Sequence, residues 1–202
     1  RFITEDSKIR RSMYQNEIQR NELEESFIGS KEAFLRTLQM QLTIAEASLD
    51  DLQRAEELTV RTHQLNTTGY TYSYDELNQF RNSKSHVLLV ADLRDKYGPY
   101  GKIGLVLLEK KQSGWVIKLL LMSCRVMSRG IGRVLINYLR RLAYQNKVKL
   151  MAEFVLTKRN RMMLMTYKFT GFMEKKQTDN HILFENNLAS IPACPDYLKL
   201  YA

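Results

Sequence analysis

Residues 115–135 read WVIKLLLMSCRVMSRGIGRVL, and this stretch decides the fold. It opens with Trp115–Cys124, a run of strand length that is nearly continuous in apolar residues except for Lys118. A turn with two glycines, Arg129–Arg133 (RGIGR), comes next, and apolar residues then recur at helical spacing. The sequence therefore predicts a strand, a glycine turn and a helix in direct succession. Glycines let the backbone approach a phosphate group, and the free N–H groups at the helix start bind its oxygens.

Periodicity and turn residues predict the remaining elements. Two further helices are expected to begin at Ser48 and Ser73, each with an acid three residues later (Asp51 and Glu76) in the spacing of a capping box. The Gly- and Pro-containing segment 95–101 is predicted to be a turn. The other expected strands are 40–47, 86–93, 102–110, 148–154, 172–177 and 181–186, and the last expected helix is 160–169. The order from Met40 is β-α-α-β-β-β-α-β-α-β-β, an α/β (α+β) fold with a mixed central sheet.

Three regions are expected along the chain. Residues 1–39 are predicted to be a helical connector, broken at Gly29 and joined to an upstream domain, because the sequence starts without Met. Residues 40–187 form the main domain. Residues 188–202 carry Pro192 and Pro195 and are predicted to be a tail of coil.

Composition limits the classes of function. No apolar run reaches the roughly 18 residues of a membrane span, so no membrane segment is expected. The two cysteines lie far apart and the three histidines are scattered, which predicts neither a disulfide framework nor a metal site and favours a reducing, cytoplasmic setting.

Positive charge is concentrated in one part of the chain. Residues 125–176 contain 13 Lys and Arg against Glu153 and Glu174, so 13 − 2 gives +11, whereas the whole chain is +9. Such a concentration favours a phosphate-bearing or acidic partner, and a solvated basic face is the alternative. No nucleic-acid-binding motif is visible, so no nucleic acid is expected as a partner.

A second motif leads to a family. Asn160, Met163, Tyr167, Gly171 and Phe172 follow the spacing Asn-x-x-Ala-x-x-x-Tyr-x-x-x-Gly-Phe, with Met163 in place of the small residue. Together with the glycine turn and the order of elements, this motif resembles the GNAT acyltransferase superfamily over about residues 40–186. The resemblance implies a CoA-like pantetheine thioester as cofactor and a leaving thiolate protonated by Tyr167, for which a position in the core of an amphipathic helix is the alternative. Met127 stands where the superfamily usually has Arg or Gln, which weakens the expectation of CoA itself.

A narrower resemblance concerns four short segments. They are similar to the C-terminal half of FkbH-like proteins, which join a HAD-type phosphatase domain to a GNAT-like domain. The segments are Thr62–Thr68 (THQLNTT), Asp95–Gly98 (DKYG), Leu121–Gly130 (LMSCRVMSRG) and Thr157–Asn160 (TKRN). The resemblance implies transfer of a glyceryl or similar short hydroxyacyl group from a phosphorylated donor to an acyl carrier protein in polyketide-type biosynthesis. Its implied partners are the carrier protein, with its phosphopantetheine, and an upstream HAD-type domain.

Cys124 is the candidate nucleophile. It ends the apolar strand where the superfamily places the thioester, and Arg125 and Arg129 would favour its thiolate. A small buried hydrophobe is the alternative. Glu153, Asp95 and His63 are candidate bases, although a surface ion pair for Glu153 and a structural role for His63 are equally open.

The expected site therefore has catalytic and cofactor-binding parts. The catalytic residues are Cys124, Tyr167 and Glu153. The cofactor-binding residues are Met122, Arg125, Arg129, Gly130, Ile131, Gly132, Arg133 and Asn160. An acetyl-CoA-dependent N-acetyltransferase and a non-catalytic domain that docks the carrier protein are the competing functions.

Overall fold

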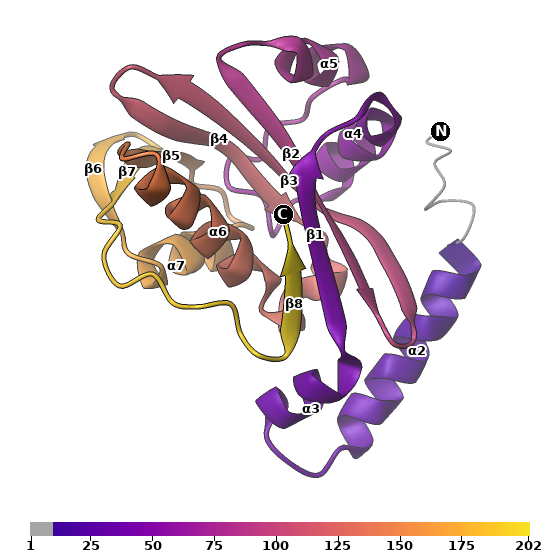
Figure 1. Ribbon diagram of the computed structural model, residues 1–202. Helices are drawn as coiled ribbons and strands as arrows, with labels where there is room; N and C mark the ends of the chain where they lie inside the picture. Colours follow the sequence, from indigo (N-terminus) through magenta and orange to yellow (C-terminus); the bar gives the residue numbers. More distant parts are fainter. Residues whose placement is uncertain (1–9) are drawn as a thin grey trace.

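The structure is a computed structural model that describes residues 10–202, and its centre is an eight-stranded sheet (Figure 1). The strand order is β6-β7-β5-β4-β3-β2-β1-β8, with parallel pairing at β4–β5 and β1–β8 and antiparallel pairing elsewhere. The strands are β1 (Met40–Glu46), β2 (His86–Asp95), β3 (Gly98–Lys111), β4 (Gly114–Met122), β5 (Leu150–Val155), β6 (Phe172–Thr178), β7 (His181–Asn186) and β8 (Leu198–Tyr201). The helices are α2 (Arg10–Ser26), α3 (Lys31–Leu38), α4 (Leu52–Arg61), α5 (Tyr74–Asn82), α6 (Ile131–Gln145) and α7 (Arg161–Phe169), with short 3-10 helices η1 (Leu49–Asp51) and η2 (Cys124–Arg129). The predicted α/β fold with a mixed sheet is confirmed.

Both faces of the central strands are buried. Leu107 and Leu119 belong to the core on the side of α4 and α5, whereas their neighbours Val106 and Leu120 belong to the core with α3, α6 and α7. Side chains alternate between the faces of a strand, so a strand covered on both sides reads as a continuous apolar run. In Figure 1, α6 and α7 lie to the left of β1, and α4 lies above and to its right.

The helix starts at the two capping boxes are confirmed. The Ser48 N–H donates to a carboxylate oxygen of Asp51 at 2.8 Å, and the Ser73 N–H donates to Glu76 at the same distance. These contacts satisfy N–H groups that have no partner within the helix. The glycine turn and the following helix are also confirmed, because α6 begins at Ile131 directly after Gly130.

The turn predicted at 95–101 is present but shorter, at residues 96–97. Asp95 pairs with Gly98 and Arg94 with Pro99, so β2 and β3 form a long hairpin that turns at residues 96–97. Irregularities in the register between Ala91 and Asp92 and between Leu93 and Arg94 accompany this extension. Bulges of this kind let strands continue through Gly and Pro.

The prediction of coil for the whole tail is wrong. Residues 198–201 form β8, which pairs in parallel with β1 from Met40 opposite Leu198 to Thr43 opposite Tyr201 (Figure 1). This pairing joins residues about 158 positions apart, taking 198 − 40, so no local pattern could indicate it. The tail thereby covers an otherwise open edge of the sheet.

The connector packs on the domain that follows it. Residues 1–9 of the predicted connector lie outside the described residues. The rest contains α2 and α3, separated near Gly29, with Ser30 as the N-cap of α3. Arg20 of α2 is buried and donates to both carboxylate oxygens of Asp95, at 2.8 Å each. Its guanidinium also lies 3.8 Å from the centre of the Tyr100 ring. Breaking a buried pair of this kind typically costs about 3–5 kcal/mol, so α2 is firmly held on the β2–β3 hairpin.

Candidate functional site

The C-terminal end of β4 presents Cys124 to solvent. After Met122 the chain enters η2, and the Ser123 hydroxyl accepts hydrogen bonds from the N–H of Arg125 (3.4 Å) and from its side-chain Nε (3.3 Å). Cys124 begins this turn as an exposed free thiol. The alternative of a small buried hydrophobe therefore does not apply.

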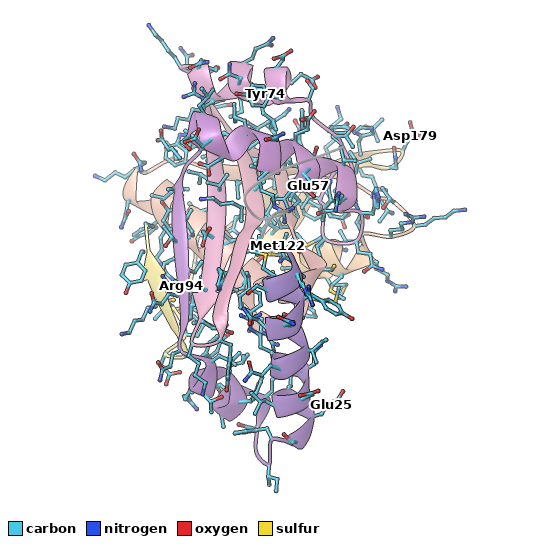
Figure 2. The ribbon with its side chains drawn as sticks, turned by 90° about the vertical axis from the view of Figure 1, so that its right-hand side faces the viewer. Glu25, Glu57, Tyr74, Arg94, Met122 and Asp179 are labelled. Atoms are coloured by element: carbon cyan, nitrogen blue, oxygen red, sulfur yellow. The ribbon has the colours of Figure 1, made fainter. Side chains whose placement is uncertain are left out.

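Cys124 lines a cavity of about 590 Å³, which we call the Cys124 cavity. Figure 2 shows Met122, the last residue of β4, near the middle of the molecule, between α4, which carries Glu57, and the end of α2 opposite Glu25. The cavity draws on the same elements. Its lining residues are Met13, Arg54, Leu58, Arg61, Thr62, His63, Gln64, Leu65, Ser123, Cys124, Arg125 and Arg159.

Four arginines give this cavity a strongly positive character. Arg54 and Arg61 come from α4, Arg125 follows Cys124, and Arg159 precedes α7. Glu57 is fully buried and pairs with both helix arginines, with Arg54 at 2.7 Å and with Arg61 at 3.1 Å. The Glu57 carboxylate thus orients two guanidinium groups, and among residues 10–202 the cavity lining contains four arginines and no acidic side chain. Such a cluster suits a carboxylate or phosphate ligand.

His63 is the second group in this cavity that can carry out chemistry. It follows the C-terminus of α4, its side chain is exposed, and its ring has no hydrogen-bond partner among residues 10–202. The contacts of His63 therefore do not support the structural role that the sequence left open for it. The seven-residue spacing of Arg54 and Arg61 places both on one helix face, a sequence signal that points to the arginine cluster.

The glycine turn lines a second cavity of about 640 Å³, which we call the glycine-turn groove. Gly130 has a φ of +75°, and a side chain there would meet the Tyr197 hydroxyl, 2.6 Å from an added Cβ. An added Cβ at Gly132 would lie 2.6 Å from the terminal methyl of Met122. A side chain at Gly130 would be strained at this φ, and a large side chain at Gly132 would crowd the wall of the groove. Tyr197, from the tail that was predicted to be coil, forms part of the wall.

The groove can hold an anionic group at the start of α6. Gly130 is the N-cap and has no side chain to cap the helix, and among residues 10–202 no side chain accepts a hydrogen bond from the backbone N–H groups of the first turn. The side chains of Arg133 and Lys31 line the same groove. A helix N-terminus with two cations beside it fits a phosphate. The predicted residues Met122, Gly130, Gly132 and Arg133 all line this groove.

Arg129 and Arg125 lie away from the glycine-turn groove. Arg129 is 1% exposed, pairs with Glu24 of α2 at 2.6 Å and lies 5.6 Å from the centre of the Phe34 ring. Arg125 lines the Cys124 cavity instead. The buried pair of Arg129 with Glu24 holds α2 on the domain. Of the arginines predicted to bind the cofactor, only Arg133 lines the groove formed by residues 10–202.

The opening between β4 and β5 is filled by the chain itself. These strands pair only as far as Ile117 and Ala152 and then diverge. Thr67 lies between them, fully buried: its N–H donates to the Leu120 carbonyl at 3.0 Å, its hydroxyl accepts from the Leu120 N–H at 3.0 Å, and its carbonyl accepts from the Val155 N–H at 2.9 Å. The edges of both strands are therefore already hydrogen-bonded where they separate.

Asn160 forms hydrogen bonds that hold the segment containing Thr67 in place. Its side-chain amide donates to the carbonyls of Asn66 at 3.1 Å and Val155 at 2.8 Å, and its oxygen accepts from the Thr157 N–H at 2.9 Å. Its side chain is fully buried and lines neither cavity. These contacts account for an Asn at this position without a ligand.

Tyr167 lies in the aromatic core behind the segment. Its ring is fully buried against Phe154, Phe172 and Phe184, with ring centres 4.7–6.0 Å apart. The hydroxyl faces Thr67 without reaching hydrogen-bond geometry and has no partner among residues 10–202. Burial raises the pKa of this phenol. It lines neither cavity, so a ligand in either one does not contact it in this arrangement.

Two candidate bases are engaged elsewhere. Glu153 forms an ion pair with Lys118 and lines neither cavity. Asp95 holds Arg20 and accepts a hydrogen bond from the Tyr100 hydroxyl at 3.0 Å. Among the three candidates, only His63 shares a cavity with Cys124.

Neither a metal centre nor a membrane helix is found among residues 10–202. No group of three or more His, Cys, Asp or Glu side chains there is arranged to hold a metal ion. Within the same range no helix is both long and apolar enough to cross a bilayer.

Comparisons with known proteins bear on the fold. Neither a protein-family model nor a curated protein sequence matches the chain. Among solved structures, the ribosomal-protein-alanine N-acetyltransferase of Escherichia coli matches with a TM-score of 0.56 and 15% identity over 72% of this chain and 92% of that one. A GNAT-family acetyltransferase of Streptococcus pneumoniae matches with a TM-score of 0.52 and 18% identity over 72% and 98%.

A third structure, the PaiA N-acetyltransferase of Thermoplasma acidophilum in complex with coenzyme A, matches with a TM-score of 0.53 and 14% identity over 72% and 98%. At such identities the likeness establishes the fold. The chain therefore has the fold of the GNAT acetyltransferases, as the two sequence motifs predicted.

Proposed function

We propose that this chain is the GNAT-like half of an FkbH-type protein, which moves a glyceryl or similar short hydroxyacyl group to the pantetheine thiol of an acyl carrier protein. The group would be carried as a thioester on Cys124. The observation that supports this proposal is the placement of an exposed Cys124 in one cavity with His63 and four arginines. An upstream HAD-type domain, implied by the sequence resemblance, would prepare the phosphorylated donor.

In the first half-reaction, His63 accepts the proton of the Cys124 thiol. The thiolate attacks the carbonyl carbon of the donor, and a carbon–sulfur bond forms. The bond from that carbon to the leaving group, a phosphate, breaks, and the phosphate departs with the electron pair. The arginines of the cavity neutralise the negative charge of the donor and of the departing phosphate. His63 then releases its proton to solvent.

In the second half-reaction, the acceptor thiol gives its proton to His63. Its sulfur attacks the carbonyl carbon of the acyl-cysteine, a new thioester forms, and the bond to Cys124 breaks. The Cys124 thiolate recovers a proton from His63. The phosphate of the acceptor arm would lie at the N-terminus of α6, beside Lys31 and Arg133. Leu65 lines both cavities, so an arm in the glycine-turn groove would reach Cys124 past this residue.

An acetyl-CoA-dependent N-acetyltransferase is the competing function, because the matching solved structures are N-acetyltransferases. In the GNAT superfamily the thioester lies where β4 ends and a Tyr protonates the leaving thiolate. Here Thr67 fills the opening beside β4, and Tyr167 is buried behind it. These two observations favour the cysteine route over direct transfer from CoA. A non-catalytic docking domain is the third possibility.

Intact-protein mass spectrometry separates the three functions. The protein, together with its HAD-type domain, is incubated with a donor in which the glyceryl group is activated as an acyl phosphate. We expect the mass of the wild-type protein to increase by one glyceryl group and the mass of Cys124→Ala to stay unchanged. Acyl transfer from acetyl-CoA to an amine without such an adduct would identify the N-acetyltransferase. If the folded protein transfers an acyl group to neither acceptor, the remaining function is that of a non-catalytic docking domain.

A further inference from the structure

Helix α7 has apolar side chains on both of its faces. Met163 and Tyr167 point into the core and are fully buried. Met162, Met165 and Phe169 are 48%, 39% and 76% exposed, and their spacing of three and four residues places them in one row on the outer face. We call these three residues the α7 stripe. An amphipathic helix normally presents polar residues on its outer face, so an exposed apolar row is typical of a surface that binds a partner.

The α7 stripe continues into the glycine-turn groove. Met162 and Phe169 belong both to the stripe and to the groove lining, and Met127, 41% exposed, lines the same groove. Soluble proteins seldom expose connected apolar surface except at binding sites. Methionine side chains adapt readily to the shape of a partner, which suits a surface that must admit and release it.

The stripe is flanked mainly by positive charge. Arg161 and Lys168 are exposed on α7, and Arg133 is exposed at the rim of the groove. The nearby acids are paired, Glu174 with Lys168 at 2.9 Å and Glu32 with Arg36 at 3.6 Å. Exposed pairs of this kind are weak and exchange readily, so the surface presents net positive charge to a partner.

We propose that the α7 stripe docks an acidic helix of the carrier protein, so that its pantetheine arm enters the adjoining groove. The inference rests on the proposed function and adds to it the surface that the carrier occupies. An amphipathic helix matches both features, since its apolar residues cover the methionines and its acids meet Arg161 and Lys168. Nucleic acid would use the cations but leave Met162 and Met165 exposed, which favours the protein partner.

Equilibrium binding tests this surface with a matched pair of variants. The probe is a holo acyl carrier protein of fatty-acid synthesis, a small acidic helical protein with a phosphopantetheine arm. Met165→Glu places a charge in the stripe, and Val60→Glu places one on α4, where Val60 is 42% exposed and lines neither cavity. We expect Met165→Glu to weaken binding about tenfold or more, the scale of a central contact residue, and Val60→Glu to leave it unchanged.

A second variant and a small-molecule ligand complete the test. Lys168→Glu should also weaken carrier binding, and raising the ionic strength to about 0.15 M should reduce the wild-type affinity, since charges are then screened beyond roughly 8 Å. Coenzyme A, which has the arm without the protein, should bind all variants equally because Met165 lies outside the groove lining. Carrier binding that is insensitive to Met165→Glu, or absent in the wild type, would overturn the docking surface.

The proposed function fails in a different way. If the holo-carrier binds with the expected sensitivity at α7 but Cys124 is never acylated, the docking surface stands and the cysteine route is wrong. The proposal would also be overturned if the carrier does not bind but a duplex RNA does, and if Met165→Glu weakens the binding of that RNA.

Discussion

The Cys124 cavity and the glycine-turn groove have similar volumes, about 590 and 640 Å³, but different linings. The first gathers four arginines and a histidine around a thiol. The second has a helix N-terminus at one end and methionines, prolines and a phenylalanine along its sides. A compact anion suits the first, and a long arm with one phosphate suits the second. Under the proposed function, the donor would bind in the first cavity and the acceptor arm in the second.

The separation depends on one segment. In the GNAT superfamily the thioester lies at the end of the strand that β4 represents here, beside the opening between two diverging strands. Thr67 closes that opening with three backbone-directed hydrogen bonds, and Leu65 lies between the two cavities. Under the proposed function the acyl group must pass from one cavity to the other, and Cys124, which lines the first cavity, is its proposed carrier.

The largest effect is expected from removing the thiol. Cys124→Ala should reduce acyl transfer to the carrier by about a thousandfold or more, because it deletes the nucleophile and not a binding contact. Since Cys124 is exposed, the free energy of unfolding should change by no more than about 0.5 kcal/mol. Transfer rates and thermal unfolding measure the two effects. Cys194→Ala is the control. Transfer by Cys124→Ala at the wild-type rate would contradict the proposed thioester on Cys124.

A smaller effect is expected at the arginines. Arg61→Gln and Arg159→Gln should each raise the KM for a phosphorylated donor about 10- to 100-fold, the range for losing a charge-assisted hydrogen bond of ~1.5–3 kcal/mol. Binding of coenzyme A in the groove should not change. Arg81→Gln on α5, which lines neither cavity, is the control. An equal loss of donor and coenzyme A binding would show that the two cavities do not act separately.

The reverse pattern is expected at the glycine turn. Gly132→Leu fills the backbone approach and should weaken binding of coenzyme A or holo-carrier about tenfold, while acylation of Cys124 proceeds normally. Gly132→Ala should have a smaller effect, because its Cβ meets only the flexible end of Met122. Calorimetric titration of the two variants gives the comparison. Unchanged affinity in Gly132→Leu would place the phosphate elsewhere.

The smallest effect concerns the start of α4, the helix that supplies Arg54 and Arg61. Burial alone would raise the pKa of Asp51, but hydrogen bonds from Ser48 and the ammonium group of Lys102 outweigh it and hold the pKa below its ordinary value. A lowered pKa in the folded state contributes stability above the unfolded pKa of about 3.9, which is lost as the pH falls through the folded value.

Asp51→Asn should therefore lower the free energy of unfolding by about 1 kcal/mol at pH 7, the usual scale for a helix cap. The difference from wild type should shrink below about pH 4, where the wild-type carboxyl is itself being protonated. Urea denaturation at several pH values measures it. A difference that stays constant down to acid pH would show that the charge of Asp51 is not the cause.

Local patterns in the sequence determined much of this protein. Its strands, caps and turns could be predicted because they depend on residues close together in the chain. The two glycines and the spacing of Asn160, Tyr167 and Gly171 then predicted the fold through their resemblance to the GNAT superfamily. They also located the groove and singled out Cys124. The position of Tyr167 as a core residue was open at that level, since one spacing serves both a buried face and a ligand contact.

Only the tertiary structure decided what surrounds each of these residues. Arg61 and Arg159 lie almost a hundred positions apart and meet at Cys124 because α4 and the loop before α7 both reach the end of β4. Arg129, beside the glycine turn in sequence, turns away to pair with Glu24. Thr67 enters the sheet because two strands diverge and leave backbone groups that need partners. Such contacts depend on how distant segments pack, and no local periodicity carries that information.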